Sequence, residues 1–479
     1  MPPIVDIHTH AFNSLDYATL QFIAAHVGHL GQARTELLKA MHEALRREVE
    51  SGRSRLPARA EDLKETLFYD LAQECARELA GKESVPPEVA ASPEFWAAPA
   101  TGTAGAAPNG WGESLADFSL LGFLHYCWLT LTHDTEQMVR ELIHEAGGED
   151  NPPVQLFITH VVDMWTAFRP DLPLLGRSTL EQAAALSAVA CSSDPDLKGR
   201  DLAFMAFDPN AAIEQVGGGW QVRAGALADL RKAVDEHGCI GVKLYPLMGF
   251  RPSGNAQAIG ADGQPMGLQR GQACDEALER LYGYCVSKAL PIVAHTRWEG
   301  AWACPGARGN ADPELWRPVL VAHPTLRLDL AHLGGAEFLT GAAPAGWALT
   351  VVDLIERYNG VYTDTADHIL GRKEAETQAY LANLTALIDA SPLLGQRLLY
   401  GSDWHAILLF THHPEEYLRE VQARLVPLLT TRAPGFLGDN ALRFLGLKRG
   451  GANRKRVIDF YKAHGPYDMV HTFPPWWPA

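Results

Sequence analysis

Two histidines one residue apart end the first apolar segment of the chain, Ile4-Val5-Asp6-Ile7-His8-Thr9-His10. In a β-strand, the side chains at positions i and i+2 point to the same side. His8 and His10 would therefore project together from the end of a buried strand, where they could bind one metal ion. The alternative is a pair of surface histidines near a terminus, and the apolar residues before the pair favour the strand.

Four later apolar segments end in a charged or metal-binding side chain, namely Lys243, His295, His332 and Asp403. Each has an ordinary explanation by itself, since a lysine can extend to solvent, an aspartate can cap a helix and a histidine can be a buried polar residue. Their shared position at the ends of apolar segments indicates a common site. Imidazole and carboxylate groups bind zinc, and also iron, manganese or nickel.

Apolar segments typical of strands alternate with helical segments through most of the chain. The expected strands lie at 4–10, 154–162, 202–207, 240–245, 291–295, 326–332, 361–364 and 397–402. Such strands pair in parallel through right-handed crossovers, and eight units close into an α/β fold, the (β/α)8 or TIM barrel. The alternative is an open, doubly wound sheet, but no expected strand is followed by a G-x-G-x-x-G turn. A barrel places its active site at the carboxyl ends of the strands, where these polar residues fall.

The expected domain organisation has four parts. Residues 1–13 hold the first strand and the paired histidines, and 14–150 form a large helical insertion after that strand. Residues 151–447 complete the barrel, and 448–479 are a carboxyl-terminal extension. Because the insertion leaves from the catalytic end of the barrel, we expect it to cover the pocket or to form a dimer interface.

The composition of the 479 residues narrows the class of protein. The hydrophobic share is 47%, charged residues make up 20%, and the formal net charge is −16 without a long basic run. This balance argues against binding to nucleic acid or to an anionic membrane surface. No leader peptide and no apolar stretch of membrane-spanning length are recognised, and the seven cysteines lack CxxC spacing. The expectation is a cytoplasmic enzyme that acts on a small molecule and forms a homo-oligomer, namely a dimer.

The motifs resemble those of the amidohydrolase superfamily of metal-dependent (β/α)8 enzymes. The resemblance rests on three features: Asp6-Ile7-His8-Thr9-His10, the strand-end histidines His295 and His332, and Gly401-Ser402-Asp403. The stretches 331–335, 361–365 and 438–447 resemble the amidohydrolase-related branch, which includes aminocarboxymuconate-semialdehyde decarboxylase. The resemblance covers the first dozen residues and about 154–447, and it does not cover the insertion or the tail.

This resemblance implies roles for the polar residues at the strand ends. His8, His10 and His295 would bind a divalent metal together with Asp403, most simply zinc. In hydrolase members the aspartate also takes a proton from the metal-bound water. His332 would be either a ligand of a second metal or a general acid/base.

Lys243 decides between one metal and two. The segment Lys243-Leu244-Tyr245-Pro246 resembles dihydroorotase, in which the lysine is carboxylated and bridges two metals. An unmodified lysine at this place also occurs in relatives with one metal, where it can pair with a substrate carboxylate. The sequence leaves both arrangements open and leans to one metal.

Several further side chains are expected near the pocket. The candidates for substrate binding are Tyr245, Arg251, Arg297, Trp298 and His405. An arginine among them could hold a substrate carboxylate through two hydrogen bonds. His160 closes the second expected strand and could support the site or the substrate, and Asp364 is expected to orient a metal ligand or to cap a helix.

The function expected from the sequence is metal-dependent hydrolysis of a C–N or C–O bond in a small, carboxylated molecule. The bond would be an amide, cyclic amide, lactone or ester, attacked by a metal-activated water. No G-x-S-x-G motif signals a serine nucleophile instead. The alternatives are a metal-dependent decarboxylase or C–C hydrolase on the same residues and, more remotely, a metal-stabilised binding protein without catalysis.

Overall fold

The computed structural model of the chain groups its residues into two compact units. It describes residues 3–13, 16, 20, 23, 31–79, 118–147, 154–161, 163–164, 167, 177–298, 300, 303–368, 370, 373–411 and 413–465. The first unit contains 1–17, 135–404 and 415–479, and the second contains 18–134 and 405–414. The helix α7 (Thr135–Gly147), which lies inside the predicted insertion, therefore groups with the first unit.

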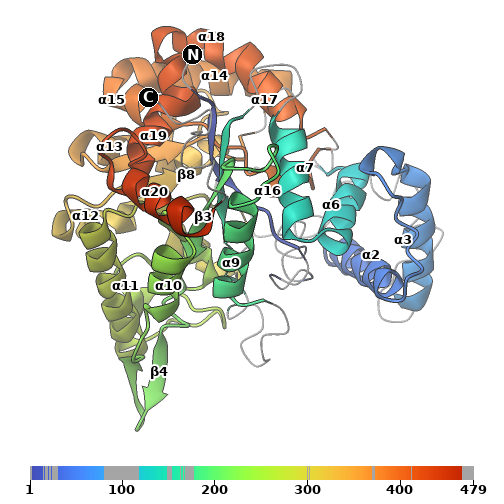
Figure 1. Cartoon of the computed structure of the whole chain (residues 1–479), viewed down its shortest axis with the longest axis horizontal. Helices are drawn as coiled ribbons and strands as arrows, with labels where there is room; N and C mark the ends of the chain where they lie inside the picture. The colour runs from blue at the N-terminus through green and yellow to red at the C-terminus, as the bar shows by residue number, and fades with distance from the viewer. Residues whose placement is uncertain are drawn as a thin grey trace. The chain divides into compact units, whose positions relative to one another are not determined.

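Eight parallel strands form the sheet of the first unit (Figure 1). In sheet order they are β1 (Val5–Thr9), β2 (Leu156–His160), β3 (Asp201–Ala206), β6 (Gly241–Leu244), β7 (Ile292–His295), β8 (Leu328–Ala331), β9 (Val361–Asp364) and β10 (Leu398–Leu399). The two edges are joined by backbone hydrogen bonds, because Ile7 N–H donates to the Tyr400 carbonyl at 3.0 Å and Asp403 N–H donates to the His8 carbonyl at 2.8 Å. The predicted (β/α)8 barrel is confirmed.

Helices follow the strands and cover the barrel. They are α9 (Thr179–Ala190), α10 (Ala228–Glu236), α11 (Leu268–Lys288), α12 (Arg317–Ala322), α13 (Gly346–Arg357), α14 (Glu374–Ala390), α15 (Pro392–Arg397), α17 (Glu416–Glu420), α18 (Val426–Leu429), α19 (Asn440–Leu445) and α20 (Ala452–His464). The start of α9 shows how the local sequence sets a boundary. Ser178 and Glu181 form a capping box, in which each side chain accepts a hydrogen bond from the backbone N–H of the other.

The structure contains a β-hairpin that the sequence analysis missed. Strands β4 (Ile213–Val216) and β5 (Gly219–Val222) pair antiparallel between β3 and α10. Gly217 and Gly218 form the turn with φ values of 59° and 83°, and glycine takes such positive values without strain. Two glycines between apolar residues are a recognised signal for such a turn. The hairpin packs on α11.

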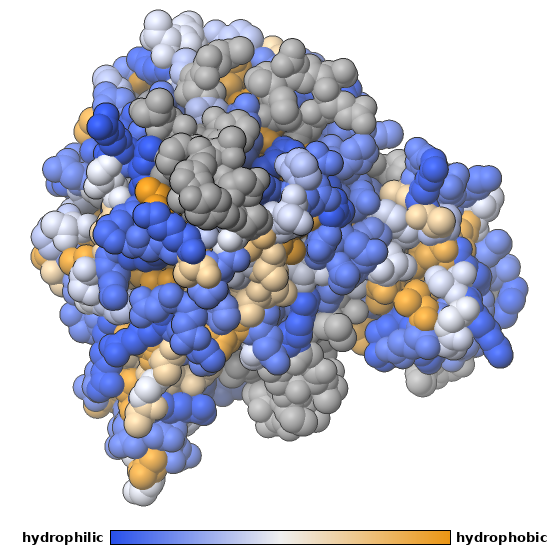
Figure 2. All heavy atoms as spheres, viewed as in Figure 1, coloured by the Kyte–Doolittle hydropathy of each residue, from blue (hydrophilic) through white to orange (hydrophobic). Residues whose placement is uncertain are grey.

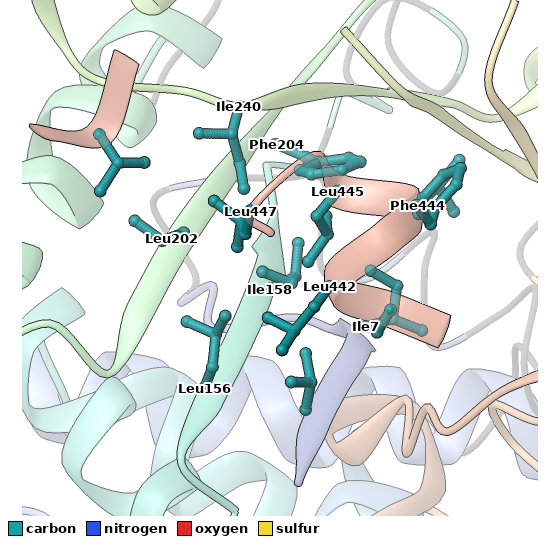
Figure 3. Close-up of a cluster of buried hydrophobic side chains, with 14 of the residues drawn as sticks. Ile7, Leu156, Ile158, Leu202, Phe204, Ile240, Leu442, Phe444, Leu445 and Leu447 are labelled. Carbon is teal, nitrogen blue, oxygen red and sulfur yellow. The ribbon is translucent and has the colours of Figure 1, made fainter. Parts of the chain in front are cut away.

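An apolar cluster joins the early residues of the strands to the last two helices. Ile7, Leu156 and Phe204 are fully buried in it beside Leu442 and Leu445 of α19, as Figure 3 shows. Residues of α20, including Val457 and Tyr461, belong to the same cluster. Apolar side chains thus hold the strands together, whereas polar side chains occupy the strand ends that carry the candidate site.

A buried aspartate at the start of β3 predicts a dependence of stability on pH. Burial raises the pKa of Asp201 to about 7, although the Thr159 hydroxyl donates a hydrogen bond to the carboxylate at 2.5 Å. In an unfolded chain an aspartate titrates near about pH 3.9. The native state therefore binds more protons between these values, and the free energy of unfolding falls as the pH rises through this window.

We expect Asp201→Asn to remove this loss. The free energy of unfolding of the variant minus that of the parent should increase by about 2–3 kcal/mol when the pH is raised from about 5 to about 8. Urea unfolding of both proteins at the two pH values measures this change. An equal difference between the proteins at both values would contradict it.

The second unit is helical. Its described helices are α2 (Gln32–Glu50), α3 (Glu65–Leu79) and α6 (Leu120–Thr132), and all three pack on one another. The rings of Phe68 and Phe123 meet edge to face with centroids 6.1 Å apart. The indole N–H of Trp128 donates to the Pro57 carbonyl at 3.0 Å. The predicted helix over 32–50 is confirmed, and most of the one expected at 20–30 lies outside the described residues.

The visible surface is mostly hydrophilic, with apolar atoms in small areas (Figure 2). The large apolar side chains that are exposed lie on separate elements, among them Val216 on the hairpin and Val321 on α12. Among the described helices, none combines the length and the apolar character needed to cross a membrane.

Candidate metal centre

His8 lies at the centre of the polar cluster and is 1% exposed. Its Nδ1 lies 2.8 Å from Oδ2 of Asp364, and its Nε2 lies 2.7 Å from Nζ of Lys243. A carboxylate can only accept a hydrogen bond, so Nδ1–H donates and Nε2 keeps its lone pair. A carboxylate that fixes the tautomer of a histidine in this way is the usual partner of a metal ligand.

His10 and His160 converge on His8 from the ends of β1 and β2. His10 donates through Nδ1–H to the carbonyl of His160 at 3.0 Å, which leaves its Nε2 as the ligand atom. One nitrogen from each of these three histidines lies within 4.8 Å of the others. The three rings are buried. This arrangement gives His160 a more central place than the supporting role expected from the sequence.

A second group of possible ligands contains His8, His332 and Asp403, whose ligand atoms also lie within 4.8 Å of one another. His332 donates through Nδ1–H to the carbonyl of Ala366 at 2.9 Å. Its Nε2 lies 3.0 Å from Nδ1 of His295, so His295 is a direct neighbour of this group. His295 belongs to neither converging group among the described residues, and its assignment as a ligand stays a prediction.

Asp403 provides the test of whether these residues suit a metal ion. Its Oδ1 is buried and has no hydrogen-bond partner among the described residues. It faces Nε2 of His10 at 3.6 Å, and that nitrogen carries a lone pair because Nδ1 holds the proton. Two buried acceptors that face each other are stabilised by a shared cation. The donor set of imidazoles and one carboxylate therefore fits a divalent metal such as zinc.

Burial sets the protonation states of the cluster. It lowers the pKa of His8, His160 and His332 well below the usual value, and Lys243 and the neighbouring histidines lower it further, whereas Asp364 acts against this shift at His332. Neutral imidazoles have lone pairs available for a metal. Burial and the nearby Asp367 raise the pKa of Asp403 to about 8.

Asp364 connects two of the histidines from the end of β9. It is fully buried, and its Oδ2 accepts from His8. Its Oδ1 accepts from the backbone N–H groups of His332 at 2.7 Å and Ala366 at 3.0 Å. The expectation that Asp364 orients a ligand agrees with this geometry. Asp6 has a similar position on β1, where its Oδ1 accepts from the backbone N–H groups of His8 and Ser402.

Lys243 reaches the cluster from β6 and is 3% exposed. Burial lowers its pKa to about 8, although Asp403, Asp364 and Asp329 act in the opposite direction. A lowered pKa increases the fraction of neutral amine, and the neutral amine is the form that can react with carbon dioxide. Whether this lysine is carboxylated stays a proposal.

The loops that carry the site contain unusual backbone conformations. His332, Leu333, Asp367 and Asp403 have φ values of 66°, 48°, 58° and 53°. Residues other than glycine rarely adopt this left-handed region, and such strain gathers at functional sites. All four residues follow β8, β9 or β10, so the loops after these strands are shaped around the cluster.

A cavity opens beside the cluster and is lined by His10, Lys243 and Tyr245. The ring of Tyr245 stacks on His295 with centroids 4.4 Å apart. Gly300 packs against this pair, because a Cβ atom at its position would lie 2.8 Å from the Tyr245 hydroxyl. Its φ of 135° is also a value that residues with a side chain rarely adopt. Tyr245 therefore has a fixed place in the cavity wall, and its role toward a substrate stays a prediction.

The other predicted substrate residues have partners elsewhere. Arg297 pairs with Asp367 and lies 3.4 Å from Glu337, so nearby carboxylates already balance its charge. Arg251 donates to Asn310 at 3.2 Å and is absent from the cavity lining. The remaining two are Trp298, whose ring meets Trp347, and His405, a buried residue of the second unit beside Tyr126. Their roles toward a substrate stay predictions.

Comparison with known proteins yields one family. The amidohydrolase family model matches residues 179–447, which is more than half of the chain. No curated protein gives a significant match. Among solved structures, an amidohydrolase from Burkholderia multivorans with bound zinc aligns at 15% identity and TM-score 0.37, over 61% of this chain and 83% of its own. A candidate metal-dependent hydrolase from Lactobacillus casei ATCC 334 aligns at 13% identity and TM-score 0.41, over 94% and 96%.

These structural similarities are distant, and the assignment rests on the family model. The matched region includes β3 and β6 to β10, and with them Lys243, His295, His332 and Asp403. The prediction from the motifs is thereby confirmed at the level of the superfamily. The chain belongs to the amidohydrolase family.

Proposed function

We propose that this protein is a zinc-dependent hydrolase of a C–N or C–O bond in a small molecule, namely an amide, cyclic amide, lactone or ester. The observation that carries the proposal is the convergence of buried histidines beside Asp403, whose Oδ1 has no hydrogen-bond partner among the described residues. His8, His10 and Asp403 would hold the metal. His160 or His332 would complete the set, and the two groups share His8.

The metal, when bound, supplies a Lewis acid and lowers the pKa of a water ligand to about 7. The chain's own residues supply the proton transfers. Asp403 is suited to accept a proton because its carboxylate lies at the histidine cluster, with Oδ1 3.6 Å from Nε2 of His10. His332 is suited to donate to a leaving group once it is protonated, since the Ala366 carbonyl holds its ring in place.

The number of metal ions depends on Lys243. With an unmodified lysine, one zinc ion would be bound, and Nζ of Lys243, which lies 2.7 Å from Nε2 of His8, would have to move away so that this nitrogen could bind the metal. A carboxylated lysine would bridge two ions, with His332 and His295 on the second. Manganese, iron and nickel remain possible occupants of the same donors.

Removal of the metal tests this function. Zinc-loaded protein is assayed with a panel of amides, cyclic amides, lactones and esters by the acid that hydrolysis releases. We expect at least one class to be hydrolysed, the rate to fall below detection after chelation and dialysis, and zinc to restore it. The exposed variant Asp229→Asn should behave like the parent.

Two results would contradict the proposal. One is hydrolysis that continues in protein shown by elemental analysis to be free of metal. The other is release of carbon dioxide from a carboxylated substrate without hydrolysis of any panel member, which would establish the decarboxylase alternative.

A further inference from the structure

Two aspartates line the cavity beside the metal centre and take no part in the proposed chemistry. Asp163 lies three residues after β2, and Asp208 lies two residues after β3. Both contact the cavity that His10 and Lys243 also line. A substrate whose reacting bond reaches His10 would therefore place another part of its structure near these carboxylates.

Asp208 is 5% exposed and is held in one orientation. Its Oδ1 accepts from the backbone N–H of Asn210 at 2.8 Å and from the Asn210 amide at 3.1 Å. Asn210 in turn accepts from Arg270 at 2.9 Å. Within the described part of the chain, Oδ2 of Asp208 has no such partner, so one oxygen of a fixed, buried carboxylate is available to a ligand.

Asp163 adds a second carboxylate to the same wall. It forms no hydrogen bond or ion pair with the described residues, and burial together with the charge of Asp208 raises its pKa to about 7. Burial also raises the pKa of Asp208 to about 6, with Arg270 acting against it. Two neighbouring carboxylates that line one cavity, of which Asp208 is buried, are stabilised by a cation.

The rest of the cavity lining suits an organic cation better than a metal ion. Val161, Met164, Phe207 and Phe250 form an apolar wall. The groups of described side chains whose ligand atoms converge include neither Asp163 nor Asp208. An apolar body that carries one hydrogen-bonding cation matches both parts of this lining.

We propose that Asp163 and Asp208 bind a protonated amine of the substrate while its reacting bond lies at the histidine cluster. This inference rests on the proposed function, and it changes the expected substrate class, because the sequence predicted a carboxylated molecule. A carboxylate at this wall would face two acidic groups, whereas an ammonium group would form charge-assisted hydrogen bonds with them.

Three hydroxamates of equal length separate the amine site from the metal site. Each binds metal at one end, and the other end is an ammonium, a methyl or a carboxylate group, as in the γ-aminobutyryl, pentanoyl and glutaryl compounds. Their affinities for the zinc-loaded full chain are measured by calorimetry. We expect the ammonium probe to bind about 10- to 100-fold more tightly than the methyl probe and the carboxylate probe to bind most weakly.

Substitutions assign the preference to the two aspartates. Asp163→Asn and Asp208→Asn should each remove most of the preference for ammonium and leave the methyl probe unchanged. Asp229→Asn, on the exposed side of α10, removes the same charge and should keep the full preference. Thermal unfolding of each variant confirms that the fold is intact.

The outcomes distinguish this inference from the proposed function. Zinc-dependent binding of all three probes with equal affinity, or tightest binding of the carboxylate, would overturn the amine site and leave the hydrolase proposal in place. Binding of none of the probes, or binding without zinc, would contradict both. Loss of one metal equivalent in Asp208→Asn would show a second metal ion where the amine is proposed.

Discussion

Asp403→Asn is expected to lower kcat by about 10³-fold or more on any substrate that the protein hydrolyses. The amide keeps the size of the side chain but removes its charge and its capacity to accept a proton. Asparagine tolerates the left-handed backbone at this position, where φ is 53°, about as well as aspartate does. The loss should therefore reflect chemistry and not misfolding.

Steady-state rates, zinc content and thermal unfolding of Asp403→Asn and the parent measure this effect. Asp229→Asn is the matched control, since it makes the same change on an exposed helix surface. A folded Asp403→Asn variant that keeps kcat within tenfold of the parent would exclude Asp403 as the proton acceptor.

Asp364→Asn is expected to weaken zinc binding by about 10- to 100-fold, although Asp364 is not one of the proposed metal ligands. In the parent, Oδ1 of Asp364 accepts hydrogen bonds from two backbone N–H groups. In the variant, the amide oxygen would therefore take the place of Oδ1, and the amide NH₂ would face Nδ1 of His8. Nδ1 must then become the acceptor, and the proton moves to Nε2, which is the nitrogen that a metal needs.

Competition with a chromogenic chelator measures the zinc affinity of Asp364→Asn. Thermal unfolding separates this positioning role from loss of packing, because a tautomer effect weakens metal binding while the unfolding temperature changes little. Zinc affinity equal to that of the parent would show that Asp364 does not set the tautomer of His8.

The sequence predicted the barrel and the end of it that carries the site. Side chains alternate between the two faces of a strand. An apolar segment that stops at a histidine or an aspartate therefore indicates a buried strand and also its carboxyl end, where a barrel carries its active site. His8, His10, His332 and Asp403 were found in this way, and the structure brings them together. The hairpin of β4 and β5 was missed although its Gly-Gly turn could be recognised.

The partners of each side chain could not be predicted, because they come from distant parts of the chain. Arg297 looked suited to a substrate carboxylate, but Asp367 lies 70 residues away in sequence and pairs with it in the fold. His160 gave the same strand-end signal as the other histidines, and only the parallel pairing of β1 and β2 shows that it meets His8 and His10. The acidic pair of Asp163 and Asp208 follows two neighbouring strands and gave no motif.

The central claim is that the histidine cluster binds a metal ion, and metal content per chain tests it most directly. Protein purified without chelator is analysed for its elements, and its intact mass is measured under non-denaturing conditions. We expect at least one zinc ion per chain, and its loss in His8→Ala. A second ion, together with a mass surplus of one carbon dioxide that disappears in Lys243→Ala, would establish the site with two bridged metals. One ion without the mass surplus would establish the site with one metal. Folded, active protein without any bound metal would contradict the account.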